Sequence, residues 1–260
     1  MTARVLGAVK RGLQPEEILR FLAEAGLLVG LLLIYWLIRG AMPERVGDSV
    51  ARAKDIVHLE QTLGIFVEAK WNDWIMHSTT LVKIANWVYL WAHLPLIIFL
   101  GIVIYVVARE RYRLYRNALL ISAAIGLVLY GFFPVAPPRL TPDFGFADTL
   151  DIFAKQSYEM QPSFFVNQYA AVPSLHFGWA LLLGIALFDI TPNIFVRAFA
   201  VFFPTVMFAA IVLTANHFIF DGIVGGLVVI VAIAIAFRLH RERFGWWKQA
   251  RPSADAGVDG

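Results

Sequence analysis

The chain has 260 residues, of which 59% are hydrophobic, 14% aromatic and only 16% charged. Soluble domains carry roughly 25% charged residues, and a globule of this length still needs a polar exterior. The composition therefore excludes a soluble globular enzyme and a disordered chain, and a net charge of +3 is too small to indicate a nucleic-acid partner. Without cysteine there is no disulfide or thiolate chemistry. We expect an integral membrane protein in a lipid bilayer.

Apolar runs predict an all-α fold, a polytopic bundle of six transmembrane helices. A bilayer core of about 30 Å needs roughly 20 mostly apolar helical residues. The predicted spans cover residues 21–38, 84–108, 117–133, 173–188, 198–213 and 220–237. Pro95 interrupts the second span, and Arg39 after the first argues against a cleavable signal peptide. The membrane domain is expected over residues 21–240, between an N-terminal segment, 1–20, and a polar tail, 241–260.

Residues 41–83 form a long connection between the first two predicted spans, and their charges nearly cancel. Apolar residues recur at helical spacing from Val46 to Val57, and Trp71 and Trp74 suit the headgroup region. We expect one or two helices lying on the membrane surface. A helix packed on the bundle is an equally good interpretation.

Basic residues are distributed unevenly over the connections. They gather before the first span, between the second and third spans, and after the sixth: Arg4, Lys10, Arg11, Arg20, Arg109, Arg111, Arg113, Arg116, Arg238, Arg241, Arg243, Lys248 and Arg251. Residues 135–172 contain only Arg139 and Lys155. Because cytoplasmic loops are enriched in Lys and Arg, we expect both termini in the cytoplasm. The loops after the first, third and fifth spans are then extracytoplasmic.

Three motifs at the external ends of the spans contain polar residues that are costly at membrane depth and are therefore functional candidates. They lie at the outer end of the third span, at the outer start of the fourth and at the junction of the fifth and sixth. They are FPVAPPRL at 133–140, AVPSLHFGWA at 171–180 and TANHFIFDGIVGG at 214–226. The span count, made without regard to these motifs, brings all three to the same leaflet.

His217 and Asp221 are four residues apart, which on a helix places them within hydrogen-bond reach. A carboxylate on one ring nitrogen makes the other nitrogen more basic, so His217 is a candidate nucleophile or base. A purely structural pair is the alternative. With His176, the pair also forms a two-histidine, one-carboxylate set, and a metal-dependent hydrolase is therefore a competing function.

Pro173 and Ser174 predict the start of the fourth helix, whose free N–H groups bind phosphate readily. His176 in the same turn could protonate a leaving oxygen, although a cap and an interfacial histidine are also consistent with these positions. Arg139, held by two prolines, could clamp an anion or contact lipid phosphates at the surface. Further candidates for a headgroup pocket are Asn167, Tyr169 and Asn216.

These motifs resemble the type 2 phosphatidic acid phosphatase superfamily. The resemblance rests on PSLH at 173–176, followed across one helix by His217-x-x-x-Asp221. With APPR at 136–139, it is closest to the branch that contains inositol phosphorylceramide synthase.

The resemblance implies a six-span enzyme that works without a metal or another cofactor. His217 would form a phosphohistidine, and Asp221 would orient its ring. His176 would protonate the leaving oxygen, while Arg139 and Ser174 would hold the phosphoryl oxygens.

The sequence departs from the family pattern at cationic positions. Phe132 stands where a lysine is expected, seven residues before Arg139, and Ala210 and Ile211 replace a Ser-Arg pair ahead of the last histidine. A site with one arginine should favour a singly charged phosphodiester over a doubly charged monoester.

We therefore expect a lipid-phosphate phosphatase acting at the outer membrane face on a lipid that carries a phosphate or phosphodiester. A phosphotransferase that moves an inositol-phosphate type of headgroup between lipids is the nearest alternative, because water and an alcohol can meet the same intermediate. A non-catalytic lipid transporter or binding protein is a third hypothesis.

Overall fold

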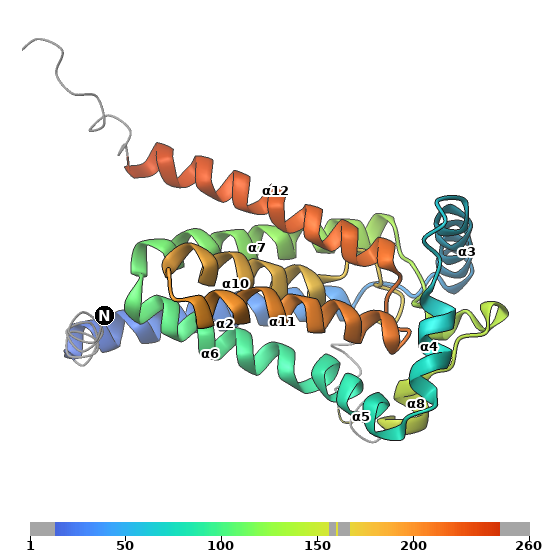
Figure 1. Ribbon diagram of the computed structural model, residues 1–260. Helices are drawn as coiled ribbons and strands as arrows, with labels where there is room; N and C mark the ends of the chain where they lie inside the picture. Colours follow the sequence, from blue (N-terminus) through green and yellow to red (C-terminus); the bar gives the residue numbers. More distant parts are fainter. Residues whose placement is uncertain (1–13, 156–159, 161–166, 245–260) are drawn as a thin grey trace, which may run out of the picture.

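A computed structural model describes residues 14–155, 160 and 167–244. Helices dominate these residues, and no β-strand occurs among them. A bundle is formed by helices α2 (Pro15–Gly40), α6 (His93–Val107), α7 (Arg109–Phe132), α10 (Leu175–Ile190), α11 (Ile194–Leu213) and α12 (Ile219–Phe244) (Figure 1). Most of the expected N-terminal segment and polar tail, including Arg4, Lys10, Arg11, Lys248 and Arg251, lies outside the described residues.

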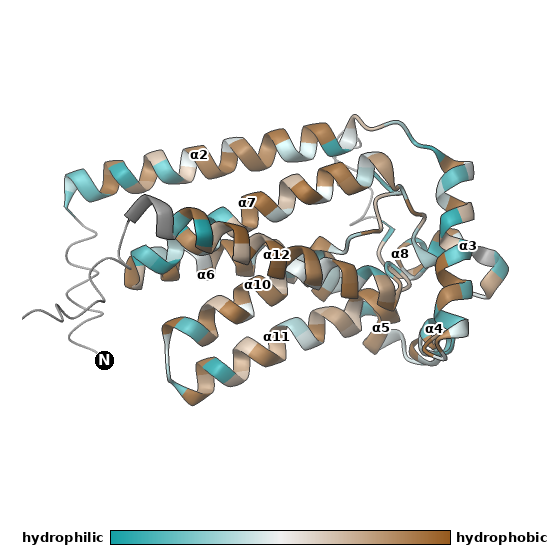
Figure 2. Cartoon of the chain, turned by 90° about the horizontal axis from the view of Figure 1, so that it is seen from above, coloured by the Kyte–Doolittle hydropathy of each residue, from teal (hydrophilic) through white to brown (hydrophobic). Residues whose placement is uncertain are grey.

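Five helical stretches of the described chain are long and apolar enough to cross a membrane: Pro15–Gly40, Thr79–Val107, Arg109–Phe132, Ile194–Leu213 and Ile219–His240. The expected fourth span, α10, is apolar but has only 16 residues, fewer than the roughly 20 of a typical crossing. It runs through the middle of the bundle and packs against α6, α7, α11 and α12 (Figures 1 and 2). Its neighbours therefore bury much of its apolar surface.

The basic stretch 109–116 is helical rather than a loop, which corrects the sequence prediction. It forms the first turns of α7, at the end of the bundle where α2 begins and α12 ends (Figure 1). There Arg109 pairs with Glu17 and Arg116 pairs with Glu24, both on α2. Because these carboxylates balance the arginine charges, the apolar helix can begin with a basic segment.

The second span begins earlier than predicted, and Pro95 does not interrupt it. Helix α5 (Thr79–Trp87) continues through a π-helical turn, η1 (Val88–Ala92), into α6. A proline cannot donate to the carbonyl four residues before it, and the wider hydrogen-bond spacing of a π-turn accommodates it without a break.

Helices α3 (Val46–Thr62) and α4 (Glu68–Met76) lie across the other end of the bundle (Figure 1). Helix α3 buries Ala53 and Val57 against the loops at that end, so the packed-helix interpretation describes this face. Trp71 and Trp74 of α4 are exposed. Hydrophobic residues extend along the bundle helices, whereas hydrophilic residues concentrate near their ends and on α3 (Figure 2).

Two buried glutamates from α3 and α4 bind the N-terminus of α12. Glu60 Oε1 accepts a hydrogen bond from Phe220 N–H at 2.8 Å, and Glu68 Oε1 accepts one from Ile219 N–H at 2.9 Å. The first N–H groups of a helix have no acceptor within the helix, and carboxylates stabilise that partly positive end. This glutamate clamp fixes the start of α12.

The two glutamates differ in their hydrogen bonding. Burial and a hydrogen bond between its carboxyl group and Glu68, which needs a proton, together raise the pKa of Glu60 to about 9, although the Phe220 N–H opposes the shift. The two oxygens of Glu68 both accept backbone N–H groups, from Ile219 and, at 2.9 Å, from Val67. Glu60 is therefore a donor and an acceptor, whereas Glu68 only accepts.

We predict that Glu60→Gln preserves the fold and that Glu68→Gln destabilises it. At position 60 an amide donates and accepts like a protonated carboxyl group, but at position 68 its NH₂ would face a backbone N–H. Loss of such a charged hydrogen bond costs about 1.5–3 kcal/mol, which thermal unfolding in detergent measures. Equal losses in the two variants would contradict the assignment.

The same clamp predicts a pH dependence. The folded-state pKa of Glu60 lies above its unfolded value of 4.5, so its contribution to stability is complete below pH 4.5 and is lost as the pH rises towards about 9. As the pH rises through this range, the unfolding temperature of the wild type should therefore fall relative to that of Glu60→Gln. Parallel pH profiles would contradict a protonated Glu60.

Candidate active site

Three backbone hydrogen bonds join the loop after α7, the loop before α10 and the turn between α11 and α12. They run from Ala171 N–H to Val135 O (3.2 Å), from Arg139 N–H to Ala215 O (2.8 Å) and from Ser174 N–H to Asp221 O (3.0 Å). Each bond connects a different pair of the three sequence motifs. The motifs, which are distant in the chain, therefore meet at one end of the bundle.

The chain reverses direction after α11 through a Schellman motif. Asn216 N–H donates to Ile211 O and Ala215 N–H donates to Val212 O, both at 3.0 Å. Ala215 has φ 53°, in the left-handed region that glycine usually occupies at this position. The turn places His217 just before α12 rather than on it, which corrects the expectation of a pair on one helix.

His217 and Asp221 form the expected contact despite this difference. His217 Nδ1 lies 3.2 Å from Asp221 Oδ2, and the same oxygen accepts Phe218 N–H at 3.0 Å. Asp221, in the first turn of α12, reaches back to the residues before the helix, as in half of a capping box. An ionised Asp221 can only accept, which places the proton on Nδ1 and leaves Nε2 with its lone pair.

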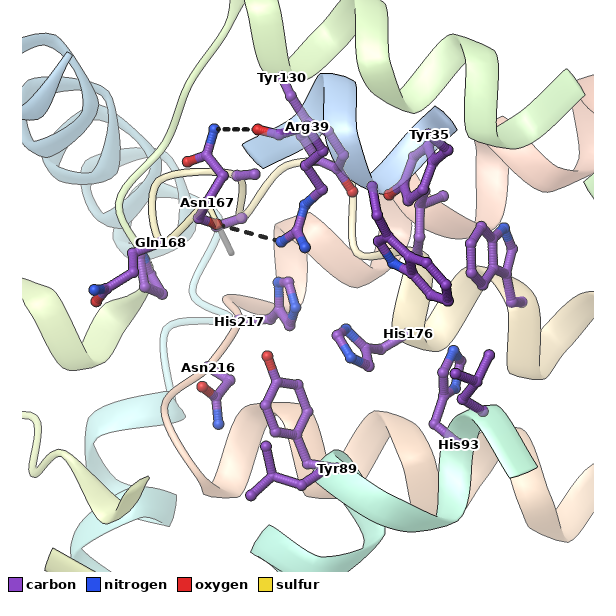
Figure 3. A pocket seen from close by; sticks show the side chains of 18 of the residues that line it. Tyr35, Arg39, Tyr89, His93, Tyr130, Asn167, Gln168, His176, Asn216 and His217 are labelled. Atoms are coloured by element: carbon purple, nitrogen blue, oxygen red, sulfur yellow. Dashed lines mark hydrogen bonds between the residues drawn. The ribbon is translucent and has the colours of Figure 1, made fainter. Parts of the chain in front are cut away.

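His176 lies in the first turn of α10 and faces His217, with 5.9 Å between ring centroids. Tyr89 from the π-turn packs 4.4 Å from the His176 ring, and His93 from α6 packs 4.9 Å from it (Figure 3). The buried Nδ1 of His93 has no hydrogen-bond partner among the described residues. Three imidazoles and a phenol thus meet within one small region.

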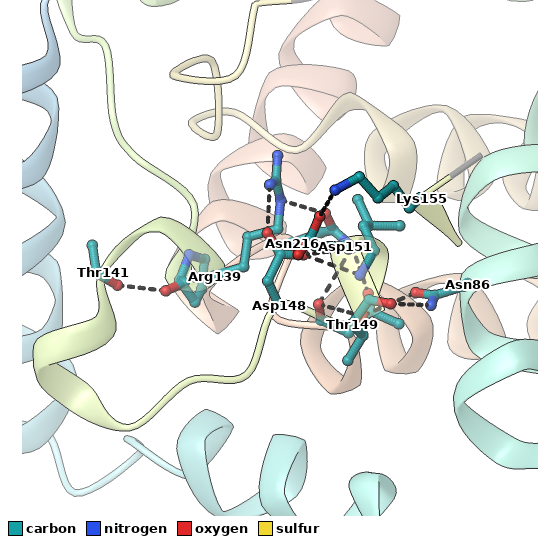
Figure 4. Close-up of polar contacts among 11 residues, drawn as sticks. Asn86, Arg139, Thr141, Asp148, Thr149, Asp151, Lys155 and Asn216 are labelled. Atoms are coloured by element: carbon teal, nitrogen blue, oxygen red, sulfur yellow. Dashed lines mark hydrogen bonds and ion pairs between the residues drawn. The ribbon is translucent and has the colours of Figure 1, made fainter. Parts of the chain in front are cut away.

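Arg139 is a buried and oriented cation. Its Nη1 lies 3.0 Å from Asp148 Oδ2, and its Nε donates to Asn216 Oδ1 at 3.2 Å (Figure 4). Asp148 is in turn the N-cap of helix α8 (Thr149–Phe153). Such charge-assisted contacts fix the guanidinium, and Asp148 balances its charge.

These groups share one cavity of about 370 Å³. Its wall includes His176, His217, Arg139, Asn167 and Asn216, which were all candidates in the sequence. No aspartate or glutamate is among the described residues that line the cavity. Arginines and histidines without an acidic neighbour in the wall make a site for an anion.

Three of the candidates do not line the cavity: Asp221, which contacts His217 Nδ1, Ser174 and Tyr169. Ser174 is fully buried as the N-cap of α10, its N–H is occupied by Asp221 O, and its Oγ has no hydrogen-bond partner in the described part of the chain. Pro173 precedes this cap rather than lying in the first helical turn. Tyr169 packs in a hydrophobic cluster with Val135.

Sequence reasoning missed Arg39, Tyr89 and Asp148. Arg39 at the end of α2 and Tyr89 in the π-turn both line the cavity (Figure 3). Arg39 was visible only as the charge that ends the first span, and Tyr89 only as one aromatic residue in an apolar run. Asp148 carried a weak signal, as an acidic residue in a loop with few basic partners.

The structure does not arrange a metal site from the candidates. Asp221 directs Oδ2 to His217 Nδ1, behind the cavity, while His176 lies on the far side of the His217 ring. Within residues 14–155, 160 and 167–244, no group of three His, Cys, Asp or Glu side chains is placed to hold a metal ion.

Glycine at position 225 allows α10 and α12 to approach closely at the site. A Cβ at Gly225 would lie 2.2 Å from Ser174 O, whereas one at Gly226 would meet only side chains, at 3.4 Å. We predict that Gly225→Ala disturbs the Ser174–Asp221 bond and costs about 1–3 kcal/mol through overpacking. Gly226→Ala is the matched control. Thermal unfolding compares them, and a wild-type midpoint for Gly225→Ala would refute this packing.

A family model described as the PAP2 superfamily matches residues 54–235. No curated protein and no solved structure matches the chain. The match covers more than half of the chain and includes all three motifs, together with α4 and most of α3. The motifs carry the His217–Asp221 pair and the buried Arg139 at one end of the apolar bundle. By this match, the chain belongs to the PAP2 superfamily.

Proposed function

We propose that the protein is an integral membrane lipid-phosphate phosphatase that acts through a phosphohistidine at His217. Membership of the PAP2 superfamily and several apolar helices indicate a membrane protein of phosphatase type that acts on lipid phosphates. The observation that carries the proposal is the shared cavity. His217 enters it with Asp221 behind the ring, and His176 and Arg139 line the same space.

In the first step, His217 Nε2 attacks phosphorus, and the bond from phosphorus to the leaving oxygen breaks. His176 gives a proton to that oxygen, so the lipid leaves as an alcohol. Asp221 stabilises the positive charge that develops on the His217 ring. Arg139 and the N–H groups of the first turn of α10 stabilise the charge on the phosphoryl oxygens.

In the second step, water attacks the phosphorus of the phosphohistidine, and His176 accepts a proton from this water. The P–N bond breaks, so inorganic phosphate leaves and His217 is restored. The Asp221 contact at Nδ1 keeps Nε2 available for each cycle.

We place this cavity at the outer membrane face. Helices α3 and α4 cover the cavity end of the bundle, while Arg109 and Arg116 lie at the opposite end (Figure 1). The excess of basic residues at that end supports a cytoplasmic position for it. With α10 counted as the sixth crossing, both ends of the described chain lie on the cytoplasmic side.

Transfer of a phospho-headgroup between lipids is a second candidate, and the Arg139–Asp148 pair favours it. Since Asp148 balances the charge of Arg139, this pair suits a singly charged phosphodiester better than a dianionic monoester. His217 would then carry the headgroup phosphate, of inositol-phosphate type, and an alcohol of the acceptor lipid would take it. Incubation with lipid phosphates and phosphodiesters, with and without inositol, distinguishes free phosphate from a new lipid.

We predict that His217→Ala abolishes turnover, by at least about 1000-fold, without lowering the unfolding temperature. With a phosphorus-labelled lipid phosphate, the wild type should acquire an acid-labile covalent label that this variant lacks. Retained label or turnover in His217→Ala would contradict the proposal.

We predict a leaving-group effect for His176→Ala. A lipid alkoxide needs a proton to leave, so formation of the phosphoenzyme should slow by about 100- to 10,000-fold. Nitrophenolate is stable without a proton, so the burst of nitrophenolate released from a nitrophenyl phosphate should be much less affected. Burst kinetics with both substrates measures this, and equal losses would exclude His176 as the acid.

A further inference from the structure

Arg39 brings a second guanidinium into the catalytic cavity from a helix that lies outside the family-matched region. It is in the last turn of α2, far in sequence from the three motifs. Its side chain points toward His217 from the opposite side to Tyr89 (Figure 3). The cavity wall thus holds Arg39 and Arg139 together with the catalytic imidazoles.

The position of Arg39 is fixed by its neighbours. Nη2 donates to Asn167 O at 3.3 Å, and the side chain of Asn167 donates back to Arg39 O, also at 3.3 Å. The guanidinium lies 5.6 Å from the ring centroid of Tyr130, whose hydroxyl donates to Pro173 O at 2.9 Å. Arg39 is therefore connected to the loop and the helix start that carry the second motif.

A phosphoryl group in this cavity would be stabilised by a second cation in addition to Arg139. Asp148 balances Arg139 at 3.0 Å, so that arginine contributes little net charge. Arg39 lines the same cavity as His217 from a different helix. Its guanidinium can therefore donate to a phosphoryl oxygen in the space in front of His217.

The wall next to Arg39 suits a phosphate attached to an apolar chain. On α2, Leu33 and Trp36, which precede Arg39 in the chain, line the cavity, and Trp91 and Leu94 line it from the second span. Inorganic phosphate would contact only the cations, whereas a lipid phosphate would also place its apolar chain against these side chains of α2 and the second span.

We propose that Arg39 is a phosphate-binding residue of this site and that α2 forms part of the lipid-phosphate pocket. The inference rests on the proposed function. It assigns to α2 the cation that the motifs lack and makes the pocket more favourable for a dianionic monoester than Arg139 and Asp148 alone.

The first test compares Arg39→Gln with Arg45→Gln. Arg45 is an exposed arginine near the same end of the bundle, where it donates to Gly131 O at 2.7 Å outside the cavity. For Arg39→Gln, the KM for phosphatidic acid in mixed micelles and the Ki of orthovanadate should both rise about 10- to 100-fold. Arg45→Gln should stay within about twofold.

A comparison of substrates separates phosphate binding from a structural role. Arg39→Gln should weaken a dianionic monoester more than a singly charged phosphodiester, and Arg39→Lys should recover part of the loss. Equal losses for the two substrates, or an unchanged orthovanadate Ki, would overturn the inference even if His217→Ala is inactive.

A labelling experiment on the wild type needs no folded variant. Orthovanadate should protect Arg39, but not Arg45, from modification by phenylglyoxal, as read by mass spectrometry. Full modification of Arg39 at saturating orthovanadate overturns the inference. Turnover retained by His217→Ala would instead contradict the proposed function, so the two failures are distinguishable.

Discussion

The site depends on the backbone hydrogen bonds that join its three motifs in pairs. The bonds from Ala171 to Val135, from Arg139 to Ala215 and from Ser174 to Asp221 connect segments that come from different helix ends. Because buried backbone groups must find partners, these bonds fix the loops relative to one another. His217, with Asp221 at its ring, and the guanidinium of Arg139 can then reach one cavity, although they come from different segments of the chain.

The region between α2 and α5 supports the same arrangement from outside the bundle. Glu60 and Glu68 bind the first N–H groups of α12, and Asp221 lies in that same turn. A carboxyl group is costly to bury unless it is protonated or hydrogen-bonded, and the raised pKa of Glu60 reflects this cost. Helices α3 and α4 thus cover this end of the bundle and hold the start of α12, which carries Asp221.

Much of the fold could be predicted from apolar runs, because bilayer thickness dictates helix length. Five of the predicted spans correspond to helices long enough to cross a membrane. The third, fourth and fifth spans end within two residues of the predicted positions. The extent of α7 could not be predicted, since the carboxylates that balance Arg109 and Arg116 come from α2. The short α10 depends on neighbours that a sequence pattern does not reveal.

The candidate site shows the same division. Pairs close in sequence, such as His217 and Asp221, could be predicted because their spacing restricts their geometry. Arg39, Asp148 and the glutamate clamp depend on contacts between distant segments, and a charge at a helix end or in a loop carries no sign of its partner. Ser174 shows the reverse case, since a motif position proved to be a buried cap rather than part of the cavity wall.

We propose that His217 Nε2 is the atom that bonds to phosphorus, and a structure of the protein in nanodiscs with orthovanadate would show this bond. We expect vanadium bonded to His217 Nε2, with His176 on the opposite side and the Arg139 guanidinium at an equatorial oxygen. Vanadate bonded to His176 or to Ser174 Oγ, or bound away from this cavity, would contradict it.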